Sequence, residues 1–250
     1  MGVFKSKYRI MKRILYSIIA LFCFTLPISK GWAVKRPSAK SVASSDKPDK
    51  GPEDKGTAKG TADKGTEVFG AIGFVDAKKN DFSLQLDIRY ATKNNFTHQV
   101  LYSDARCWLK KPVAEALSRV QSGLKIRGLF LRVYDCYRPL SVQEKMWELV
   151  PDERYVADPK KGSRHNRGAA VDVTMIDGGG NEVEMPSGYD EFSEKSNRKY
   201  SGASKKAKIN RSILEDAMHT EGFVGLDTEW WHFDFNAWNQ YPIQNIPLSP

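Results

Sequence analysis

The composition of the chain changes near residue 68, and this change limits how much of it can fold. Residues 34–67 are rich in Lys, Gly, Ser, Thr, Asp and Pro, contain no aromatic residue, and include near-repeats of Asp-Lys-Gly-Thr at 54–57 and 63–66. Such a segment cannot offset its loss of chain entropy by burying apolar side chains. We therefore predict a flexible tether over 34–67. Residues 68–250 are long enough for one domain with a hydrophobic core.

The first 33 residues have the pattern of a secretory signal peptide. Basic residues cluster within the first 13 positions, an apolar run follows from 14 to 28, and the small residues Gly31 and Ala33 come next. A signal peptidase removes a leader of this kind, so we expect a periplasmic or secreted protein. The run is short for a bilayer span of about 20 residues. An uncleaved leader that anchors the protein to the membrane is the alternative.

The basic charge of the chain lies mostly outside the predicted domain. The whole chain has a net charge of +9, but residues 68–250 contain 25 basic and 24 acidic residues. A nearly neutral domain lacks the positive charge that nucleic-acid binding requires, so we predict no nucleic-acid partner. A weak attraction of the basic tether to an anionic envelope surface stays open.

Hydrophobic periodicity predicts a mixture of strands and helices in the domain. Strands are expected at 85–90, 129–134, 169–175 and 230–235, and helices at 112–122, 141–149 and 212–221. These elements do not alternate regularly enough for a doubly wound sheet. We expect an α+β fold, with one central, largely antiparallel sheet and helices packed around it. In the third strand Asp172 and Thr174 alternate with Val171 and Val173, which predicts one polar face.

Two short stretches, 163–172 and 229–232, contain the side chains that a catalytic zinc site needs. Zinc in a hydrolase usually takes three protein ligands from His and carboxylate, keeps a fourth position for water, and needs a separate carboxylate beside that water. We predict one zinc ion bound by His165, Asp172 and His232, with Glu229 as the general base. The other two histidines, His98 and His219, are expected to be surface residues.

The spacing of these residues constrains the sheet. Two ligands would come from one loop and strand, and the third from the strand at 230–235, so we infer that these two strands are neighbours. In a regular strand Glu229 would point away from His232. We therefore expect Glu229 at the start of its strand, where a twist or bulge turns it toward the metal.

Four segments, at 87–97, 135–139, 163–172 and 229–232, together resemble the D-alanyl-D-alanine dipeptidases. These are zinc peptidases that include the vancomycin-resistance dipeptidases and are related to DD-carboxypeptidases and to the amino-terminal domain of Hedgehog. The resemblance covers roughly residues 70 to 240 and extends to Tyr189-Asp190. It implies hydrolysis of the dipeptide D-Ala-D-Ala to D-alanine.

The resemblance also implies roles for residues outside the predicted zinc site. Arg138 would stabilise the oxyanion of the tetrahedral intermediate, Asp190 and Tyr90 would receive the free ammonium group of the substrate, and Ser163 would line the pocket. On its sequence context alone, Arg138 could instead form a structural ion pair with Asp135.

Two other functions are weighed against the dipeptidase. One is a DD-carboxypeptidase or endopeptidase that acts on peptidoglycan stem peptides. The other is a non-catalytic, zinc-stabilised wall-binding or signalling module, which the presence of both Glu229 and Arg138 argues against.

Two cysteines remain after removal of the leader, Cys107 and Cys136. In an oxidising compartment they can form one disulfide between the segment before the first helix and the Arg138 loop. Two buried free thiols are the alternative, because sequence does not establish that the residues are close.

Overall fold

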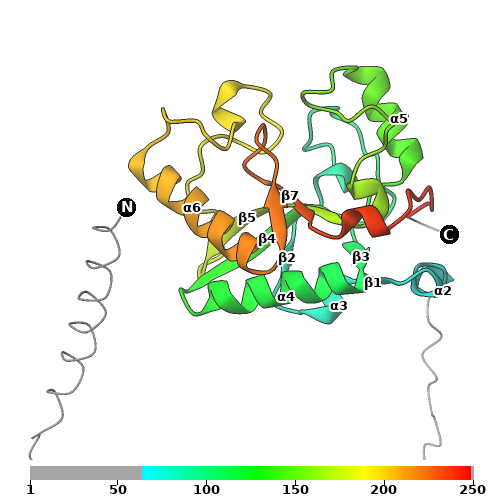
Figure 1. Cartoon of the computed structure of the whole chain (residues 1–250), viewed down its shortest axis with the longest axis horizontal. Coiled ribbons are helices and arrows are strands. Elements are labelled where there is room, and N and C mark those ends of the chain that lie inside the picture. Colours follow the sequence, from blue (N-terminus) through cyan, green and yellow to red (C-terminus); the bar gives the residue numbers. More distant parts are fainter. Residues whose placement is uncertain (1–63, 249–250) are drawn as a thin grey trace, which may run out of the picture. The chain divides into compact units, whose positions relative to one another are not determined.

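The computed structural model describes residues 64–248 (Figure 1). The predicted signal peptide and nearly all of the predicted tether lie outside the described residues. Helix α2 (Lys64–Ala71) begins before the expected boundary at residue 68, and its Phe69 is buried in the core. The domain therefore starts a few residues earlier than the composition indicated. None of the helices within 64–248 is long and apolar enough to cross a membrane.

The described elements confirm the α+β class. After α2 they are, in chain order, β1 (Phe74–Asp76), α3 (Ala77–Asn80), β2 (Gln85–Leu86), η1 (Arg89–Ala91), β3 (Trp108–Lys110), α4 (Lys111–Lys125), β4 (Leu129–Asp135), α5 (Leu140–Leu149), η2 (His165–Arg167), β5 (Ala170–Asp177), η3 (Glu194–Ser196), α6 (Lys205–Thr220), β6 (Phe223–Gly225), β7 (His232–Phe235) and η4 (Trp238–Gln240), where η denotes a 3-10 helix.

The central sheet has the strand order β2-β4-β5-β7-β6. Strand β2 runs parallel to β4, and the other neighbouring pairs are antiparallel. The sheet is thus largely antiparallel, as predicted, and β5 and β7 are the neighbours that the zinc hypothesis required. Helix α4 runs along the sheet beside α6, and α5 lies at the other end of the domain (Figure 1).

Two predicted strands end or begin elsewhere. The strand expected at 85–90 stops at Leu86, because the chain turns into η1 and places Tyr90 in the core. The strand expected at 230–235 begins at His232. Glu229 consequently lies in the turn between β6 and β7, and no bulge is needed to aim it toward the metal site.

The polar face predicted for β5 is present, and it is buried, with Asp172 at 3% and Thr174 at 1% exposure. One further expectation was wrong. Helix α6 begins at Lys205 rather than near 212. Its first turns are rich in Lys and give little hydrophobic periodicity, but the Ser204 side chain accepts a hydrogen bond from the Ala207 amide at 3.0 Å and caps the helix.

A two-stranded sheet of β1 and β3 lies beside an aromatic cluster. The Phe69 ring stacks on Trp108, with centroids 4.4 Å apart, and makes an edge contact with Tyr137. Next to this cluster Cys107 and Cys136 form a disulfide. The disulfide ties the segment before β3 to the segment after β4.

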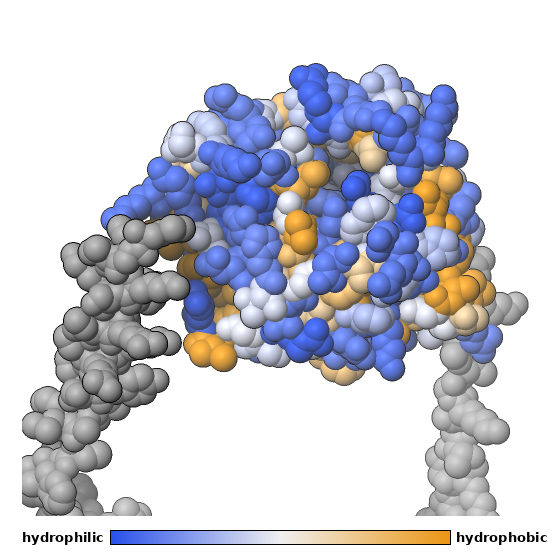
Figure 2. Space-filling model, in the orientation of Figure 1, coloured by the Kyte–Doolittle hydropathy of each residue, from blue (hydrophilic) through white to orange (hydrophobic). Residues whose placement is uncertain are grey.

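Hydrophilic residues cover most of the face shown in Figure 2, and apolar residues form only small groups on it. Phe82 and Ile126 are among the exposed apolar side chains of the domain. Single exposed apolar side chains are ordinary on soluble domains and indicate no interface by themselves.

The structure has no free space for a side chain at Gly168, and the substitution Gly168→Ala measures the cost of adding one. Its φ is 64°, and an added Cβ would lie 2.2 Å from the Phe74 ring. The left-handed conformation costs about 1–2 kcal/mol in a residue with a Cβ, and overpacking costs about 1–3 kcal/mol more. We expect Gly168→Ala to lower the free energy of unfolding by about 2–5 kcal/mol in urea denaturation.

Gly128→Ala is the matched control, because Gly128 has φ 69° but open space around the added Cβ. It should lose only the backbone cost of about 1–2 kcal/mol. Equal losses in the two variants would show that the Phe74 contact imposes no constraint.

Candidate active site

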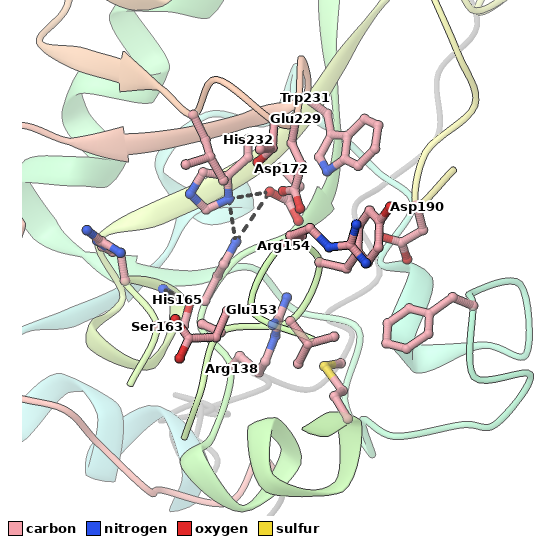
Figure 3. Close-up of a pocket in the computed structure, with 18 of the residues that line it drawn as sticks. Arg138, Glu153, Arg154, Ser163, His165, Asp172, Asp190, Glu229, Trp231 and His232 are labelled. Atoms are coloured by element: carbon pink, nitrogen blue, oxygen red, sulfur yellow. Dashed lines mark hydrogen bonds and ion pairs between the residues drawn. The ribbon is translucent and has the colours of Figure 1, made fainter. Parts of the chain in front are cut away.

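Three side chains of types that can bind a metal meet at the edge of strands β5 and β7. His165 belongs to η2, Asp172 to β5 and His232 to β7, and all three are buried. His232 Nδ1 lies 3.0 Å from Asp172 Oδ1 and 3.2 Å from His165 Nε2 (Figure 3). His165 Nε2 lies 3.3 Å from Asp172 Oδ1. The three atoms form a nearly equilateral triangle.

This triangle fits a tetrahedral zinc ion. Donor atoms about 2.1 Å from a tetrahedral ion lie about 3.4 Å from one another, close to the three observed separations. Among the described residues, 64–248, His165, Asp172 and His232 are the group whose ligand atoms all lie within 4.8 Å of one another. Two histidines and one carboxylate leave a position for water, as catalytic zinc sites do.

Each histidine has a second partner that fixes its orientation. His165 Nδ1 donates to the Cys136 carbonyl oxygen at 2.7 Å, which leaves the Nε2 lone pair for a metal. His232 Nε2 lies 3.0 Å from Asp234 Oδ1, which leaves Nδ1 for a metal. Such outer hydrogen bonds select the tautomer that can bind zinc.

Asp172 is held in the same way. Its Oδ2 accepts a hydrogen bond from the Tyr189 hydroxyl at 2.9 Å, while Oδ1 faces the histidines. Burial opposes ionisation of this carboxyl group, but His165 and His232 outweigh burial and hold the Asp172 pKa well below its usual range. The carboxylate is therefore in the ionised form that could bind a metal ion.

Glu229 lies in the turn before β7 and lines the same pocket. It is not part of the three-residue metal group. Burial raises the pKa of Glu229 to about 7, and Asp172 adds to the rise, although His232 opposes it. A carboxyl group with such a pKa can accept and release a proton near neutral pH.

Arg138 follows β4 and is buried. Its Nη2 and Nε donate to Asp135 Oδ2 at 2.6 and 3.2 Å, and Nη1 donates to Gln143 Oε1 at 2.8 Å. The ion pair with Asp135 is thus present. Burial alone would lower the Arg138 pKa, but Asp135 outweighs burial and holds that pKa above its usual value. The guanidinium group also lines the pocket, and its five N–H groups exceed the three used in these bonds.

Asp190 and Tyr90 form a hydrogen-bonded pair on another wall of the pocket. The Tyr90 hydroxyl donates to Asp190 Oδ2 at 3.0 Å. Burial raises the Asp190 pKa well above its usual range, and Asp172 and Glu229 raise it further. Asp190 also has φ 55°, in the left-handed region that Asp adopts more readily than most residues. A cation bound beside Asp190 would offset the repulsion between its carboxylate and those of Asp172 and Glu229.

All eight residues singled out by the sequence line one pocket of about 260 Å³. They are Tyr90, Arg138, Ser163, His165, Asp172, Asp190, Glu229 and His232. The volume lies below the range of about 300–1,000 Å³ that is common for drug-sized ligands, which favours a smaller ligand. Trp231 forms part of the wall, and His98 and His219 are exposed, as predicted.

Asp234 and Tyr189 contact the site residues but were not among those predicted from the sequence. The contact of Asp234 with His232 could have been predicted, because Asp234 lies two residues after His232 and therefore on the same strand face. The contact of Tyr189 with Asp172 could not, since it depends on how the segment after β5 folds back over the sheet.

A buried two-histidine, one-carboxylate centre beside a separate carboxyl group defines the class of zinc hydrolases. A family model described as D-Ala-D-Ala dipeptidase, peptidase M15, matches residues 71–245. The chain belongs to this family, and it is a zinc metallopeptidase.

Two relatives of the chain are named D-alanyl-D-alanine dipeptidase. The D-alanyl-D-alanine dipeptidase of Escherichia coli strain K12 is 39% identical over 160 residues, which cover 64% of this chain and 83% of that protein. The D-alanyl-D-alanine dipeptidase of Enterococcus faecalis strain ATCC 700802 / V583 is 29% identical over 182 residues, covering 64% and 90%.

Solved structures show a more distant likeness. VanYB in complex with D-alanine-D-alanine has a TM-score of 0.35 and 16% identity, over 58% of this chain and 82% of that one. A variant of the vancomycin resistance D,D-pentapeptidase VanY in complex with Zn(II) has a TM-score of 0.34 and 15% identity, over 58% and 84%.

Removal of the Tyr189 hydroxyl should weaken metal binding. In Tyr189→Phe the ring contacts stay but Asp172 loses its outer hydrogen bond. Losses of this kind typically cost about 10–100-fold in metal affinity, and we expect a rise of this size in the zinc dissociation constant, measured by competition with a chelator. Tyr200→Phe, in the loop before α6, is the control and should leave the constant unchanged. Equal constants in the two variants would contradict an orienting role for Tyr189.

Proposed function

We propose that the chain hydrolyses D-alanyl-D-alanine to D-alanine, with zinc bound by His165, Asp172 and His232 and with Glu229 as the general base. The observation that carries this proposal is the triangle of donor atoms 3.0–3.3 Å apart in a small pocket that also contains Glu229. When bound, zinc supplies a Lewis acid that lowers the pKa of a coordinated water and polarises a carbonyl group.

Glu229 and Arg138 would carry the two remaining tasks of amide hydrolysis. The Glu229 carboxylate accepts a proton from the attacking water and later passes it to the departing amine. The Arg138 guanidinium, fixed by Asp135 and Gln143, offers its remaining N–H groups to the oxyanion of the tetrahedral intermediate. Because its partners hold the guanidinium in place, little reorganisation is needed during the reaction.

Asp190 and Tyr90 would select the length of the substrate. A free dipeptide has an ammonium group next to the bond that is cleaved, and the Asp190 carboxylate supplies its counter-charge. A longer peptide has an uncharged amide at that position, so the desolvated Asp190 carboxylate would keep its hydrogen bond from Tyr90 but lack a counter-charge. Ser163 lines the pocket beside His165, away from Asp190 (Figure 3), and its hydroxyl accepts a hydrogen bond from the His165 amide at 3.2 Å.

A periplasmic or secreted location is part of the proposal. The leader pattern of residues 1–33 supports it. The disulfide between Cys107 and Cys136 also supports it, because disulfides persist in oxidising compartments.

Glu229→Gln separates a base from a ligand. The variant should keep one zinc per chain, measured by metal analysis, and lose about 10²–10⁴-fold in kcat, which is the usual contribution of a proton-transfer group. Glu221→Gln is the control, since Glu221 pairs with Arg119 at 2.6 Å at the end of α6 and should leave kcat unchanged. Loss of zinc from Glu229→Gln would make Glu229 a ligand and overturn the assignment.

Substrate length tests the dipeptidase proposal itself. D-Ala-D-Ala should be cleaved about 10²-fold or more faster, in kcat/KM, than its N-acetylated form, because acetylation removes the charge that Asp190 binds. Asp190→Asn should narrow this ratio. Release of terminal D-alanine from a muramyl pentapeptide as efficient as dipeptide cleavage would favour the DD-carboxypeptidase alternative. The zinc chemistry would be unchanged in that case.

A further inference from the structure

Arg198 is a buried arginine that lies against the turn between β6 and β7. Only 7% of it is exposed. Its Nε donates to the Leu226 carbonyl oxygen at 3.1 Å, and its Nη2 donates to the carbonyl oxygens of Glu229 and His232 at 3.0 and 2.9 Å. One guanidinium group thus binds both ends of the turn and the residue proposed as the base.

The surroundings of Arg198 are shaped to hold a planar group. Its guanidinium carbon lies 4.5 Å from the centroid of the Phe233 ring. On another side, a Cβ added to Gly225 would lie 2.2 Å from that guanidinium carbon. The glycine therefore leaves the space that the guanidinium occupies, and the ring and the strand together fix its plane.

The two backbone hydrogen bonds that the turn makes among Leu226, Glu229 and His232 are long, and its shorter ones run to neighbouring segments. The amide of Glu229 donates to the Leu226 carbonyl, and the amide of Leu226 donates to the His232 carbonyl, both at 3.3 Å. Ordinary N–H···O bonds have their mode near 2.9–3.0 Å. The bonds from Arg198 are shorter than these two, and its own amide binds the Asp227 carbonyl at 2.9 Å. The segment around Arg198 thus supplies a large part of the support of the turn.

We propose that Arg198 is a positioning residue of the peptidase, which acts through the backbone of the β6–β7 turn to set the places of Glu229 and His232. The expected effect of Arg198 on hydrolysis rests on the proposed function. The charge of the guanidinium strengthens each bond to a carbonyl, and the fork geometry sets their directions. A displacement of about 1 Å in a reacting group can cost about 10²-fold in rate, so support of this turn matters for the chemistry.

The test is Arg198→Lys, because an ammonium group keeps the charge but cannot reproduce the planar fork. We expect kcat on D-Ala-D-Ala to fall about 10–100-fold with KM changed little, since the loss concerns the geometry of the transition state. We also expect the zinc dissociation constant, measured without substrate, to rise about 10-fold, because His232 shifts with the turn.

Arg211→Lys is the matched control. The Arg211 Nη1 also donates to backbone carbonyls, those of Tyr200 at 3.1 Å and Asn197 at 3.5 Å, but these belong to the loop before α6. Zinc affinity and kcat should stay near those of the unmodified enzyme in this variant, even if its melting temperature falls. Equal effects of the two substitutions on zinc affinity and kcat would overturn the proposal and leave Arg198 a purely structural residue.

A second variant covers the case in which Arg198→Lys does not fold. Gly225→Ala places a methyl group where the guanidinium lies, and in the folded protein it should reproduce the lower kcat and the weaker zinc binding. Normal zinc affinity and normal kcat in folded Gly225→Ala would contradict the proposal. Because the zinc measurement needs no substrate, it decides the role of Arg198 even if the enzyme prefers another peptide.

Discussion

The antiparallel pairing of β5 with β7 places Asp172 directly opposite His232, and the rest of the active site depends on this register. Residues opposite each other in such a pair have Cα atoms about 4.5–5.5 Å apart, which lets their side chains share one metal ion. On the other side of β5, Asp135 of β4 pairs with Asp172 after an irregularity in the ladder. The three strands thus place Asp135, Asp172 and His232 in one row across the sheet. Asp172 and His232 are the two proposed ligands from the sheet, and Asp135 is the carboxylate that orients Arg138.

The acidic character of the pocket follows from this arrangement. Several carboxyl groups converge on it or border it, namely Asp135, Asp172, Asp190, Glu229 and Asp234. Burial and mutual repulsion raise the pKa values of Asp190 and Glu229, while the histidines keep Asp172 ionised. Such a cluster favours bound cations. A metal ion beside Asp172 and a substrate ammonium beside Asp190 would each supply one.

Much of the fold and the site could be predicted from the sequence. The regular alternation in β5 and the helical periodicity of α4 and α5 gave their positions, and the spacing of His165, Asp172 and His232 gave both the metal group and the adjacency of two strands. These signals are local, because each reflects the chemistry of a few residues close together in the chain.

What the sequence did not reveal depends on contacts between distant segments. Tyr189 reaches Asp172 only because the chain folds back after β5, and Arg198 reaches the β6–β7 turn across about thirty residues. The early end of β2 has the same origin, since burial of Tyr90 overrides the strand pattern of its segment. Helix α2 was missed because its contribution to the hydrophobic core is Phe69, in a segment of tether-like composition.

Anomalous scattering at the zinc absorption edge, from crystals of the zinc-loaded protein, tests the central claim most directly. We expect one peak in the domain, about 2.0–2.2 Å from His165 Nε2, Asp172 Oδ1 and His232 Nδ1. The Glu229 carboxylate should lie outside direct bonding distance, within reach of a water on the metal. A peak bonded to Glu229 in place of one of these three ligands, or a peak elsewhere in the domain, would contradict the account.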